Sequence, residues 1–464
     1  MTKTTGIHFE VSERKILLRL MDLIVVLLGI YGLEFLFDYT YLTINLDNLR
    51  AIGVFILYFS VFGSVFEIYD LQQASKIDIS FRNIVLTAST TVLFYLLTPI
   101  VTPFLPAYRL QIIYFYVVII ITLFLWRLAY TTFISSPRFY KKVLLISEVS
   151  NIDSIIKPLR QADPNYKIIG FINCEKERED PIKFKGLKQF QPEQLQQVIL
   201  DHHISEILVA SYNSETITAD IYHELIGLLE RGFIIREYTQ VYEELTSRVP
   251  VQFVGKDFYK YFPFSRSNQN TLYQFFRRVF DIVFSVFGLL FGILISPLIL
   301  IGNAIANRGS LFYTQERIGM NTTIFKILKL RTMVPTTVKS QEGRAQNDEA
   351  RITPFGNFLR RSRLDEIPQF INVLKGEMSI IGPRPERPYF VNELSKVIPF
   401  YETRHIIKPG LTGWAQVNYR YGSTVNDSLI KLQYDLYYIK HRSIFLDINI
   451  IVKTLSTMLY YRGQ

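Results

Sequence analysis

The apolar stretch VFDIVFSVFGLLFGILISPLILI, from Val279 to Ile301, decides the fold of the C-terminal part of the chain. It is long enough for a membrane helix, which needs ~20 apolar residues. Ser296 and Pro297 lie inside it, and proline breaks or kinks a helix because it lacks an N–H and clashes with the preceding turn. Basic residues flank both ends of the stretch: Arg277, Arg278 and Arg308. We therefore predict a re-entrant membrane helix over about residues 279–302, with an ordinary spanning helix as the alternative.

The first third of the chain contains four more apolar segments, at residues 16–37, 51–69, 84–101 and 109–134. Basic residues precede the first segment and follow the fourth: Arg14, Lys15, Arg138, Lys141 and Lys142. Because cytoplasmic loops of membrane proteins carry an excess of Lys and Arg, both places are expected to face the cytoplasm. Residues 1–140 are thus predicted to form a four-helix transmembrane domain. Few ionisable groups lie within these segments, which argues against a transport path.

Residues 141–262 have the pattern of a cytoplasmic α/β domain. Three short apolar runs, 142–147, 168–172 and 206–210, alternate with helix-like stretches, which is typical of a parallel sheet. The loop after the first run, Ser147 to Asp153, contains no glycine that would let a pyrophosphate approach the backbone. We therefore predict a Rossmann-like domain with a degenerate nucleotide site and a structural or regulatory role.

The basic residues are concentrated in the C-terminal part of the chain. The formal net charge of the 464 residues is +10, and the residues from Ser265 onward carry 26 Lys and Arg against 14 Asp and Glu. This excess fits adhesion to an anionic membrane surface, binding of phosphorylated substrates, or both. The single cysteine, Cys174, excludes an internal disulfide and fits a reducing compartment.

Two adjacent carboxylates, Asp365 and Glu366, follow three closely spaced arginines: Arg360, Arg361 and Arg363. Adjacent carboxylates are unfavourable when both are ionised, unless cations compensate them. Mg²⁺ typically takes one or two carboxylates together with substrate phosphates, and arginine binds phosphate oxygens bidentately. The pattern therefore fits a phosphoryl-transfer site, in which arginines or a divalent metal compensate the two carboxylates. A solvated cluster of ion pairs fits the same residues equally well.

Residues 263–464 resemble the bacterial sugar transferases, also called polyprenyl-phosphate glycosyl-1-phosphate transferases. Eight stretches in the same order carry the resemblance: 277–281, 296–297, 312–319, 325–333, 364–369, 372–379, 382–385 and 408–416. The complete layout also resembles the long members of that family. The resemblance implies an α-rich monotopic catalytic domain over residues 263–464, anchored by a re-entrant helix that is broken at Ser296 and Pro297.

The resemblance further implies an activity, its substrates and its location. The family transfers a hexose-1-phosphate from a UDP-sugar to undecaprenyl phosphate and releases UMP, with Mg²⁺, as the first step of exopolysaccharide, capsule or O-antigen synthesis. The enzyme would be a multi-pass protein of the bacterial inner membrane, with its catalytic domain facing the cytoplasm. The partners expected are the two substrates and the lipid bilayer, with no nucleic acid, and a homodimer is compatible with the large middle domain.

In that family the Asp of the dyad is the nucleophile and the Glu is a Mg²⁺ ligand, which correspond here to Asp365 and Glu366. A sugar-phosphoryl-aspartate would divide one difficult reaction into two easier steps. A direct, single displacement is the competing mechanism. Charge and proximity to the motifs predict five phosphate-binding residues: Arg384, Arg351, Lys329, Arg331 and Arg317.

A non-catalytic membrane sensor and a transporter of lipid-linked sugars are the alternative functions. The sensor would use the middle domain and would need a glycine-rich nucleotide loop near residue 147. The transporter would need more membrane spans, with charged groups inside them. The sequence shows neither pattern.

Overall fold

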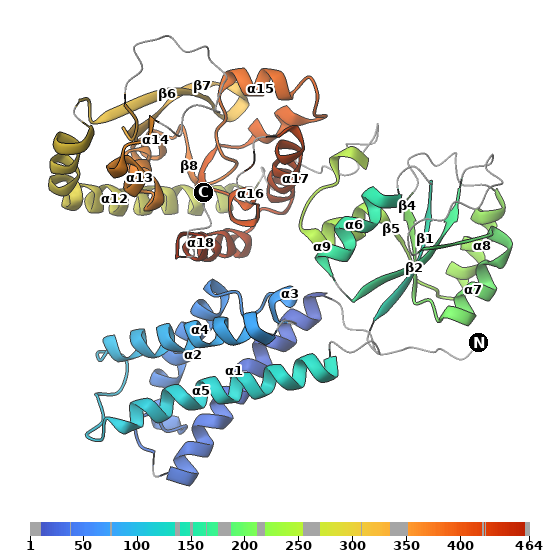
Figure 1. Cartoon of the computed structure of the whole chain (residues 1–464), viewed down its shortest axis with the longest axis horizontal. Helices are drawn as coiled ribbons and strands as arrows, with labels where there is room; N and C mark the ends of the chain where they lie inside the picture. Colours follow the sequence, from blue (N-terminus) through green and yellow to red (C-terminus); the bar gives the residue numbers. More distant parts are fainter. Residues whose placement is uncertain are drawn as a thin grey trace. The chain divides into compact units, whose positions relative to one another are not determined.

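The computed structural model divides the chain into two compact units, residues Met1–Thr246 and Ser247–Gln464, whose elements are labelled in Figure 1. The structure describes residues 11–37, 39–74, 77–134, 140–148, 152–163, 165–174, 187–210, 219–253, 270–307, 309–334, 351–419, 422 and 424–459. The domain boundary predicted at residue 262 and the flanking Arg308 lie outside these residues.

The N-terminal unit begins with long apolar helices. They are α1 (Val11–Phe37), α2 (Leu49–Val65), α4 (Ile77–Leu97) and α5 (Leu110–Ala129), with the short α3 (Leu71–Ala74) after α2 and a π-helical turn (Tyr130–Ile134) after α5. Within the described residues of the whole chain, five helical segments are long and apolar enough to cross a membrane: Glu13–Phe37, Leu46–Val65, Ile77–Leu97, Leu110–Phe133 and Thr271–Asn307. These segments indicate a membrane protein.

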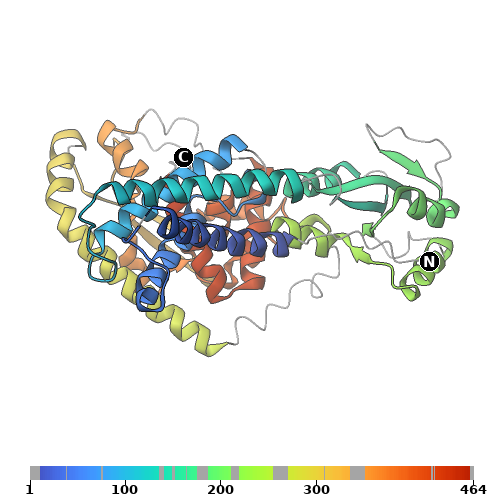
Figure 2. The ribbon, with the colours of Figure 1, turned by 90° about the horizontal axis from the view of Figure 1, so that it is seen from below.

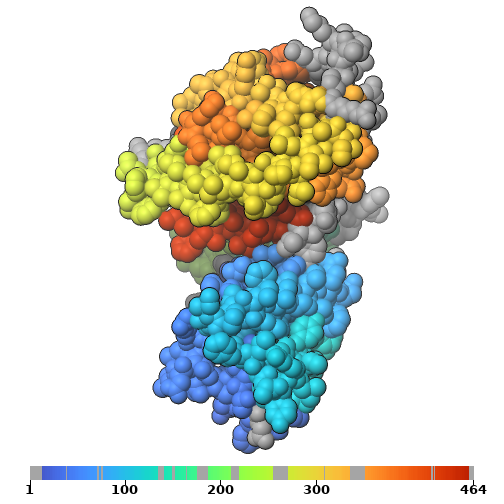
Figure 3. All heavy atoms as spheres, turned by 90° about the vertical axis from the view of Figure 1, so that its left-hand side faces the viewer, coloured from blue at the N-terminus to red at the C-terminus, as the bar shows by residue number. Residues whose placement is uncertain are grey.

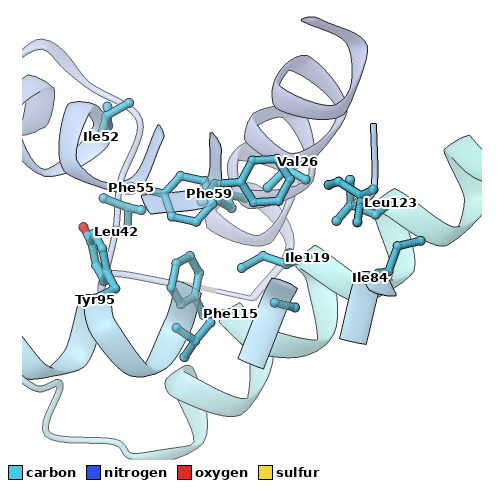
Figure 4. Packing of buried hydrophobic residues seen from close by; sticks show 14 of the residues in the cluster. Val26, Leu42, Ile52, Phe55, Phe59, Ile84, Tyr95, Phe115, Ile119 and Leu123 are labelled. Carbon is cyan, nitrogen blue, oxygen red and sulfur yellow. The ribbon is translucent and has the colours of Figure 1, made fainter. Parts of the chain in front are cut away.

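Aromatic side chains fill the space between these helices. Phe55 of α2 lies with its ring centroid 5.5 Å from Phe115 of α5 and 6.1 Å from Tyr95 of α4. Figure 4 shows these rings together, with Phe59 beside them. All four side chains are fully buried, so they tie three helices into one hydrophobic core.

A buried ion pair joins α1 to α5. Arg127 donates hydrogen bonds to Asp22 Oδ2 at 2.7 Å and to the Ile68 carbonyl at 2.9 Å, and both charged side chains are almost fully enclosed. Charged groups inside apolar helix bundles occur mainly as pairs of this kind. The sequence does not predict this pair, because Asp22 and Arg127 are far apart in the chain and lie in different apolar segments.

Residues 141–246 contain the parallel sheet that the sequence predicts. Its strands are β1 (Lys141–Ser147), β2 (Tyr166–Asn173), β3 (Lys188–Phe190), β4 (Glu206–Ala210) and β5 (Ile235–Glu237), in the order β3-β2-β1-β4-β5. Every neighbouring pair of these strands is parallel. Figure 1 shows α6 (Ile152–Ala162) and α9 (Tyr238–Thr246) on one face, and α7 (Leu195–His202) and α8 (Ala219–Glu230) on the other. Helices on both faces explain why the middle of β1, residues 143–146, is entirely apolar and fully buried.

The C-terminal unit consists of one long helix and a mostly helical core. The helix is α12 (Thr271–Gly302), continued by a π-helical turn (Asn303–Asn307). The next elements are β6 (Phe312–Ile318), β7 (Ile324–Leu330), α13 (Pro354–Arg361), η13 (Leu364–Glu366), α14 (Gln369–Lys375) and β8 (Ser379–Ile381). The chain then forms α15 (Pro388–Leu394), η14 (Tyr401–Ile406), β9 (Gly410–Thr412), α16 (Trp414–Asn418), α17 (Val425–His441) and α18 (Ile444–Leu459). β6 and β7 form an antiparallel hairpin, and β8 pairs with β9 in parallel.

Both ends of α12 contact the core of this unit. Near the start of the helix, Arg278 donates hydrogen bonds to the carbonyls of Val373 and Leu374, each at 2.7 Å. After its end, Asn307 donates to the Arg331 carbonyl at 2.9 Å. One folded body therefore holds the helix at both ends.

Two glycines bring the middle of α12 against the same core. A Cβ atom on Gly288 would lie 2.3 Å from the ring of Phe370, and one on Gly292 would lie 2.7 Å from Ile367. Real Cβ atoms do not approach so closely, so only glycine allows this contact. The two glycines are four positions apart in the sequence, which places them on one face of the helix.

The helix continues through Ser296 and Pro297 to Gly302. Pro297 cannot donate the hydrogen bond that the Ile293 carbonyl would normally accept within the helix. The Ser296 hydroxyl donates to that carbonyl instead, at 2.8 Å. Figures 1 and 2 show that the helix changes direction near its C-terminal end. The Ser-Pro pair thus removes one backbone hydrogen bond and supplies a side-chain replacement.

The outward face of α12 is apolar and exposed. In Figure 3 its yellow-green side chains form a band on the surface of this unit, next to the red C-terminal residues. Large apolar side chains line that band, among them Phe275, Phe287, Leu294 and Leu298, which are 63–76% exposed. An exposed apolar face of this length marks a surface that contacts lipid or protein.

Candidate active site

The adjacent carboxylates lie on a tight turn between two helices. Helix α13 ends at Arg361, and Arg363 then adopts a left-handed conformation, with φ of 58°. This reversal leads into the short helix η13, which carries Asp365 and Glu366. A non-glycine residue rarely holds a left-handed conformation unless the surrounding structure enforces it, and such residues are frequent at functional sites.

Three cations surround Glu366. Lys329 Nζ, from β7, lies 2.9 Å from Glu366 Oε1, and an Arg384 guanidinium nitrogen lies 3.3 Å from the same oxygen. Arg363 approaches the other oxygen, Oε2, at 3.6 Å. Burial disfavours ionisation of this carboxyl, but the cations outweigh that effect and hold the pKa of Glu366 below its usual range. Burial also lowers the pKa of Lys329, although the Glu366 charge opposes this change.

Asp365 has a different environment. Its side chain is buried, and no hydrogen-bond donor or ion-pair partner contacts its carboxylate within the described part of the chain. Burial raises the pKa of Asp365, and the negative charge of Glu366 raises it further. The two neighbours are therefore unequal: Glu366 is held ionised by cations, whereas Asp365 keeps its oxygens available for a substrate or a metal.

The described residues contain no cluster of three or more His, Cys, Asp or Glu side chains that could hold a metal ion without further ligands. Two adjacent carboxylates fit Mg²⁺ nevertheless, because this ion usually takes one or two protein carboxylates and completes its shell with water and phosphates. Asp365 and Glu366 are the residues here that would hold it.

The structure brings two of the five predicted phosphate-binding residues to the dyad, namely Lys329 and Arg384. The other three contact the backbone elsewhere. Arg317 donates to the Pro385 carbonyl at 3.1 Å, Arg331 to the Asn307 carbonyl at 2.9 Å, and Arg351 to the Val334 carbonyl at 3.0 Å. Burial lowers the pKa of Arg317 to about 10, although Glu386 opposes the change.

A cavity of about 810 Å³ lies beside the dyad. One wall is apolar and consists of α12 side chains: Phe284, Phe287 and Phe291. Glu366 and three arginines also line the cavity: Arg360, Arg361 and Arg363. Helix α18 supplies Thr454, Thr457 and Met458. The cavity therefore combines an apolar wall from the long helix with positive charge next to Glu366.

The arginines of this cavity were predicted from the sequence to lie near the dyad, but its apolar wall was not predicted. The sequence signal for the wall was the spacing of Gly288 and Gly292, which lie four residues apart in an otherwise bulky apolar helix. Such a pair of small residues predicts close approach of another segment. The partners, Phe370 and Ile367, could not be named without the structure.

Comparison with known proteins identifies the family. The family model described as bacterial sugar transferase matches residues 272–461. An Aeromonas hydrophila protein named UDP-N-acetylgalactosamine-undecaprenyl-phosphate N-acetylgalactosaminephosphotransferase is 38% identical over 223 residues, which cover 47% of this chain and 51% of the relative. A Xanthomonas campestris pv. campestris protein named UDP-glucose:undecaprenyl-phosphate glucose-1-phosphate transferase is 44% identical over 162 residues, 34% of this chain and 33% of the relative.

These two matches span about half and a third of the relatives' own lengths. A shorter Bacillus subtilis (strain 168) protein is covered more fully. It is named putative undecaprenyl-phosphate N-acetylgalactosaminyl 1-phosphate transferase and is 41% identical over 141 residues, which cover 30% of this chain and 79% of the relative. The resemblance inferred from the eight motifs is confirmed, and the chain belongs to the bacterial sugar transferase family.

Proposed function

We propose that this protein is an enzyme that transfers a hexose-1-phosphate from a UDP-sugar to undecaprenyl phosphate and releases UMP. One observation carries the proposal: none of the described residues pairs with the carboxylate of Asp365, which lies beside Glu366, and Glu366 lines a cavity walled by an apolar helix. The names of the relatives, which specify UDP-sugars and undecaprenyl phosphate, support the same reaction. The product would start exopolysaccharide, capsule or O-antigen synthesis.

The proposed mechanism has two displacements at one phosphorus. An Asp365 carboxylate oxygen attacks the sugar-linked phosphorus, the bond to the UMP oxygen breaks, and a sugar-phosphoryl-aspartate forms. A phosphate oxygen of the lipid then attacks that phosphorus, and the Asp365 oxygen leaves as a carboxylate. Lys329 and Arg384 orient and neutralise the phosphate oxygens of the donor. Mg²⁺, held by Glu366 and Asp365, would supply further charge neutralisation.

The cavity fits the second substrate. An undecaprenyl phosphate has an anionic head and an apolar chain, and the cavity has arginines beside an aromatic wall. We place the lipid phosphate near Arg360 and Arg363, and the first isoprene units along Phe287 and Phe291. Lys329 and Arg384 approach Oε1 of Glu366, whereas Arg363 approaches Oε2. The donor and the acceptor could thus reach the dyad from different sides.

Release of UMP from a panel of UDP-sugars tests this function. Purified protein with Mg²⁺ and undecaprenyl phosphate should release UMP from one or a few UDP-sugars over many turnovers. Without the lipid, release should stop after about one UMP per enzyme molecule, because the covalent intermediate has no acceptor. Well-folded protein that releases no UMP from any UDP-sugar would favour a non-catalytic membrane sensor.

We also propose the finer architecture. The strand order β3-β2-β1-β4-β5, with helices on both faces, supports a Rossmann-like middle domain. Four N-terminal helices would span the bacterial inner membrane and place this domain and the catalytic domain in the cytoplasm. A homodimer formed through the middle domain stays a prediction.

The contacts of α12 support a re-entrant, monotopic anchor. Its start, its middle and the turn after its end all contact one folded core, through Arg278, Gly288 and Asn307. A helix that crossed the bilayer would separate its two ends, and one core could not readily contact both. The exposed apolar face of the helix would then lie in one leaflet, with the catalytic core at the headgroup level.

Labelling of single cysteines tests this topology. In a Cys174→Ser background, cysteines placed at Gln274, before the apolar part of α12, and at Thr323, after it, should both be protected in intact cells. Both should react with a membrane-impermeant maleimide in inside-out vesicles. Ala107→Cys, between α4 and α5, should show the opposite behaviour and serves as the control. Labelling of Gln274→Cys and Thr323→Cys from opposite sides would refute the re-entrant anchor.

A further inference from the structure

Four consecutive backbone carbonyls in the turn that carries Arg384, those of residues 383–386, accept hydrogen bonds from other parts of the unit. Gly410 N donates to the Pro383 carbonyl at 2.8 Å, and Ile318 N donates to the Glu386 carbonyl at 3.0 Å. The two carbonyls between them accept from arginine side chains. Arg404 binds the Arg384 carbonyl at 3.2 Å, and Arg317 binds the Pro385 carbonyl at 3.1 Å. Buried backbone acceptors are usually satisfied by other backbone groups, so two arginines in this role are unusual.

Arg404 is itself fixed by buried partners. It lies in η14, and its side chain is 4% exposed. One guanidinium nitrogen donates to the Tyr401 hydroxyl at 2.8 Å. The other donates both to Asp435 Oδ2 of α17, at 2.7 Å, and to the Arg384 carbonyl. A planar guanidinium held in this way has little freedom to move.

The contact reaches the dyad through Arg384. The backbone of Arg384 is fixed by Arg404, and its side chain reaches Glu366 Oε1 at 3.3 Å. Pro383 and Pro385 restrict the backbone on both sides of this residue. The orientation of the turn therefore determines where the Arg384 guanidinium can lie. An error of about 1 Å in such a position can reduce a reaction rate by about 10²-fold.

We propose that Arg404, fixed by Asp435, is a positioning residue that acts on the reaction through Arg384. The inference rests on the proposed function, since Arg384 is taken to orient the donor phosphates beside Glu366. The competing explanation is purely structural: the buried pair of Arg404 and Asp435 would only join η14 to α17. The two explanations differ in whether the effect of Arg404 depends on the Arg384 side chain.

A double-mutant cycle separates them. Arg404→Lys keeps a positive charge beside Asp435 but lacks the planar fork that reaches three acceptors. It should lower kcat/KM for UMP release by about 10- to 100-fold. In an Arg384→Ala background, the same substitution should change kcat/KM less than about 2-fold, because the side chain that it positions is gone. Equal losses in both backgrounds would overturn the proposal.

Tyr401→Phe is the matched control. It removes another hydrogen bond of Arg404 but leaves the contacts with Asp435 and the Arg384 carbonyl in place. We expect kcat/KM within about 2-fold of the wild type, because the guanidinium nitrogen that binds Asp435 and the Arg384 carbonyl is not the one that binds Tyr401, so these two contacts suffice to hold Arg384 in place. A loss as large as that of Arg404→Lys would show that general packing around Arg404 matters, and would count against the proposal.

Hydrogen exchange provides a readout that needs no turnover. The N–H groups of Ile318 and Gly410 donate to the Glu386 and Pro383 carbonyls of the turn, so they report its order. Peptides that contain these two residues should exchange faster in Arg404→Lys than in the wild type or in Tyr401→Phe, while peptides from α17 should keep wild-type exchange. Unchanged exchange at Ile318 and Gly410, or faster exchange throughout the unit, would overturn the positioning role. Absence of UMP release from the wild type would instead refute the proposed function, so the two failures can be distinguished.

Discussion

Replacing Asp365 with asparagine should reduce sustained UMP release by at least about 10⁴-fold, as expected when a covalent nucleophile is removed. The amide has the shape of the carboxylate but cannot attack phosphorus. The same substitution should leave the melting temperature unchanged or raise it slightly. Burial already disfavours the charge of Asp365, and no described residue is paired with it. Loss of activity without loss of stability is therefore the expected signature.

Both parts of this prediction can be measured on one preparation. Thermal unfolding in detergent and UMP release should be recorded for the wild type, Asp365→Asn and Glu393→Gln. Glu393 is a surface carboxylate that pairs with Lys396, so its substitution should affect neither quantity. An Asp365→Asn enzyme with activity within about tenfold of the wild type would exclude Asp365 as the nucleophile, and direct displacement would become the preferred mechanism.

Glu366→Gln should reduce kcat by about 10³-fold, the scale seen when a major electrostatic group of an active site is removed. The substitution removes a proposed Mg²⁺ ligand, so more Mg²⁺ should be needed for half-maximal activity. Unlike Asp365→Asn, it should also destabilise the protein, by about 2 kcal/mol. Lys329, Arg384 and Arg363 would lose the anion that they share in a largely buried site.

The two dyad variants should thus differ in stability as well as in their response to Mg²⁺. UMP release should be measured over a range of Mg²⁺ concentrations, and thermal unfolding recorded, for Glu366→Gln and for the control Glu393→Gln. A Glu366→Gln enzyme with wild-type dependence on Mg²⁺ would contradict the role of Glu366 as a metal ligand. A Glu366→Gln protein as stable as the wild type would show that the folded state does not need the negative charge of Glu366 beside its three neighbouring cations.

Local patterns in the sequence predicted much of the fold. The apolar runs at 142–147, 168–172 and 206–210 lie in β1, β2 and β4, because a buried parallel strand must be apolar on both faces. The short strands β3 and β5 escaped prediction, since three residues at the edge of a sheet leave little pattern. Most of each apolar segment likewise lies in a helix, because length and hydropathy are local properties, although residues 66–69 and 98–101 lie beyond the ends of α2 and α4.

The pair of carboxylates in the candidate site was predictable because its two residues are neighbours in sequence. Asp365 and Glu366 are adjacent, so their mutual repulsion and their need for cations follow from the chain itself. Which cations approach them depends on tertiary structure. Lys329 and Arg331 are two residues apart, yet the first contacts Glu366 and the second the Asn307 carbonyl. For the same reason the Arg404–Asp435 and Arg127–Asp22 pairs left no sequence signal.

The most direct test of the central claim follows the phosphate that is attached to the sugar. A UDP-sugar carrying radioactive phosphorus in its β-phosphate is incubated with the purified protein, Mg²⁺ and undecaprenyl phosphate, and the lipid is extracted. We predict that the label moves with the sugar into the lipid and that the released nucleotide is unlabelled UMP. Label that remains in released UDP, with unlabelled sugar in the lipid, would contradict the account, because the sugar would then have moved without its phosphate.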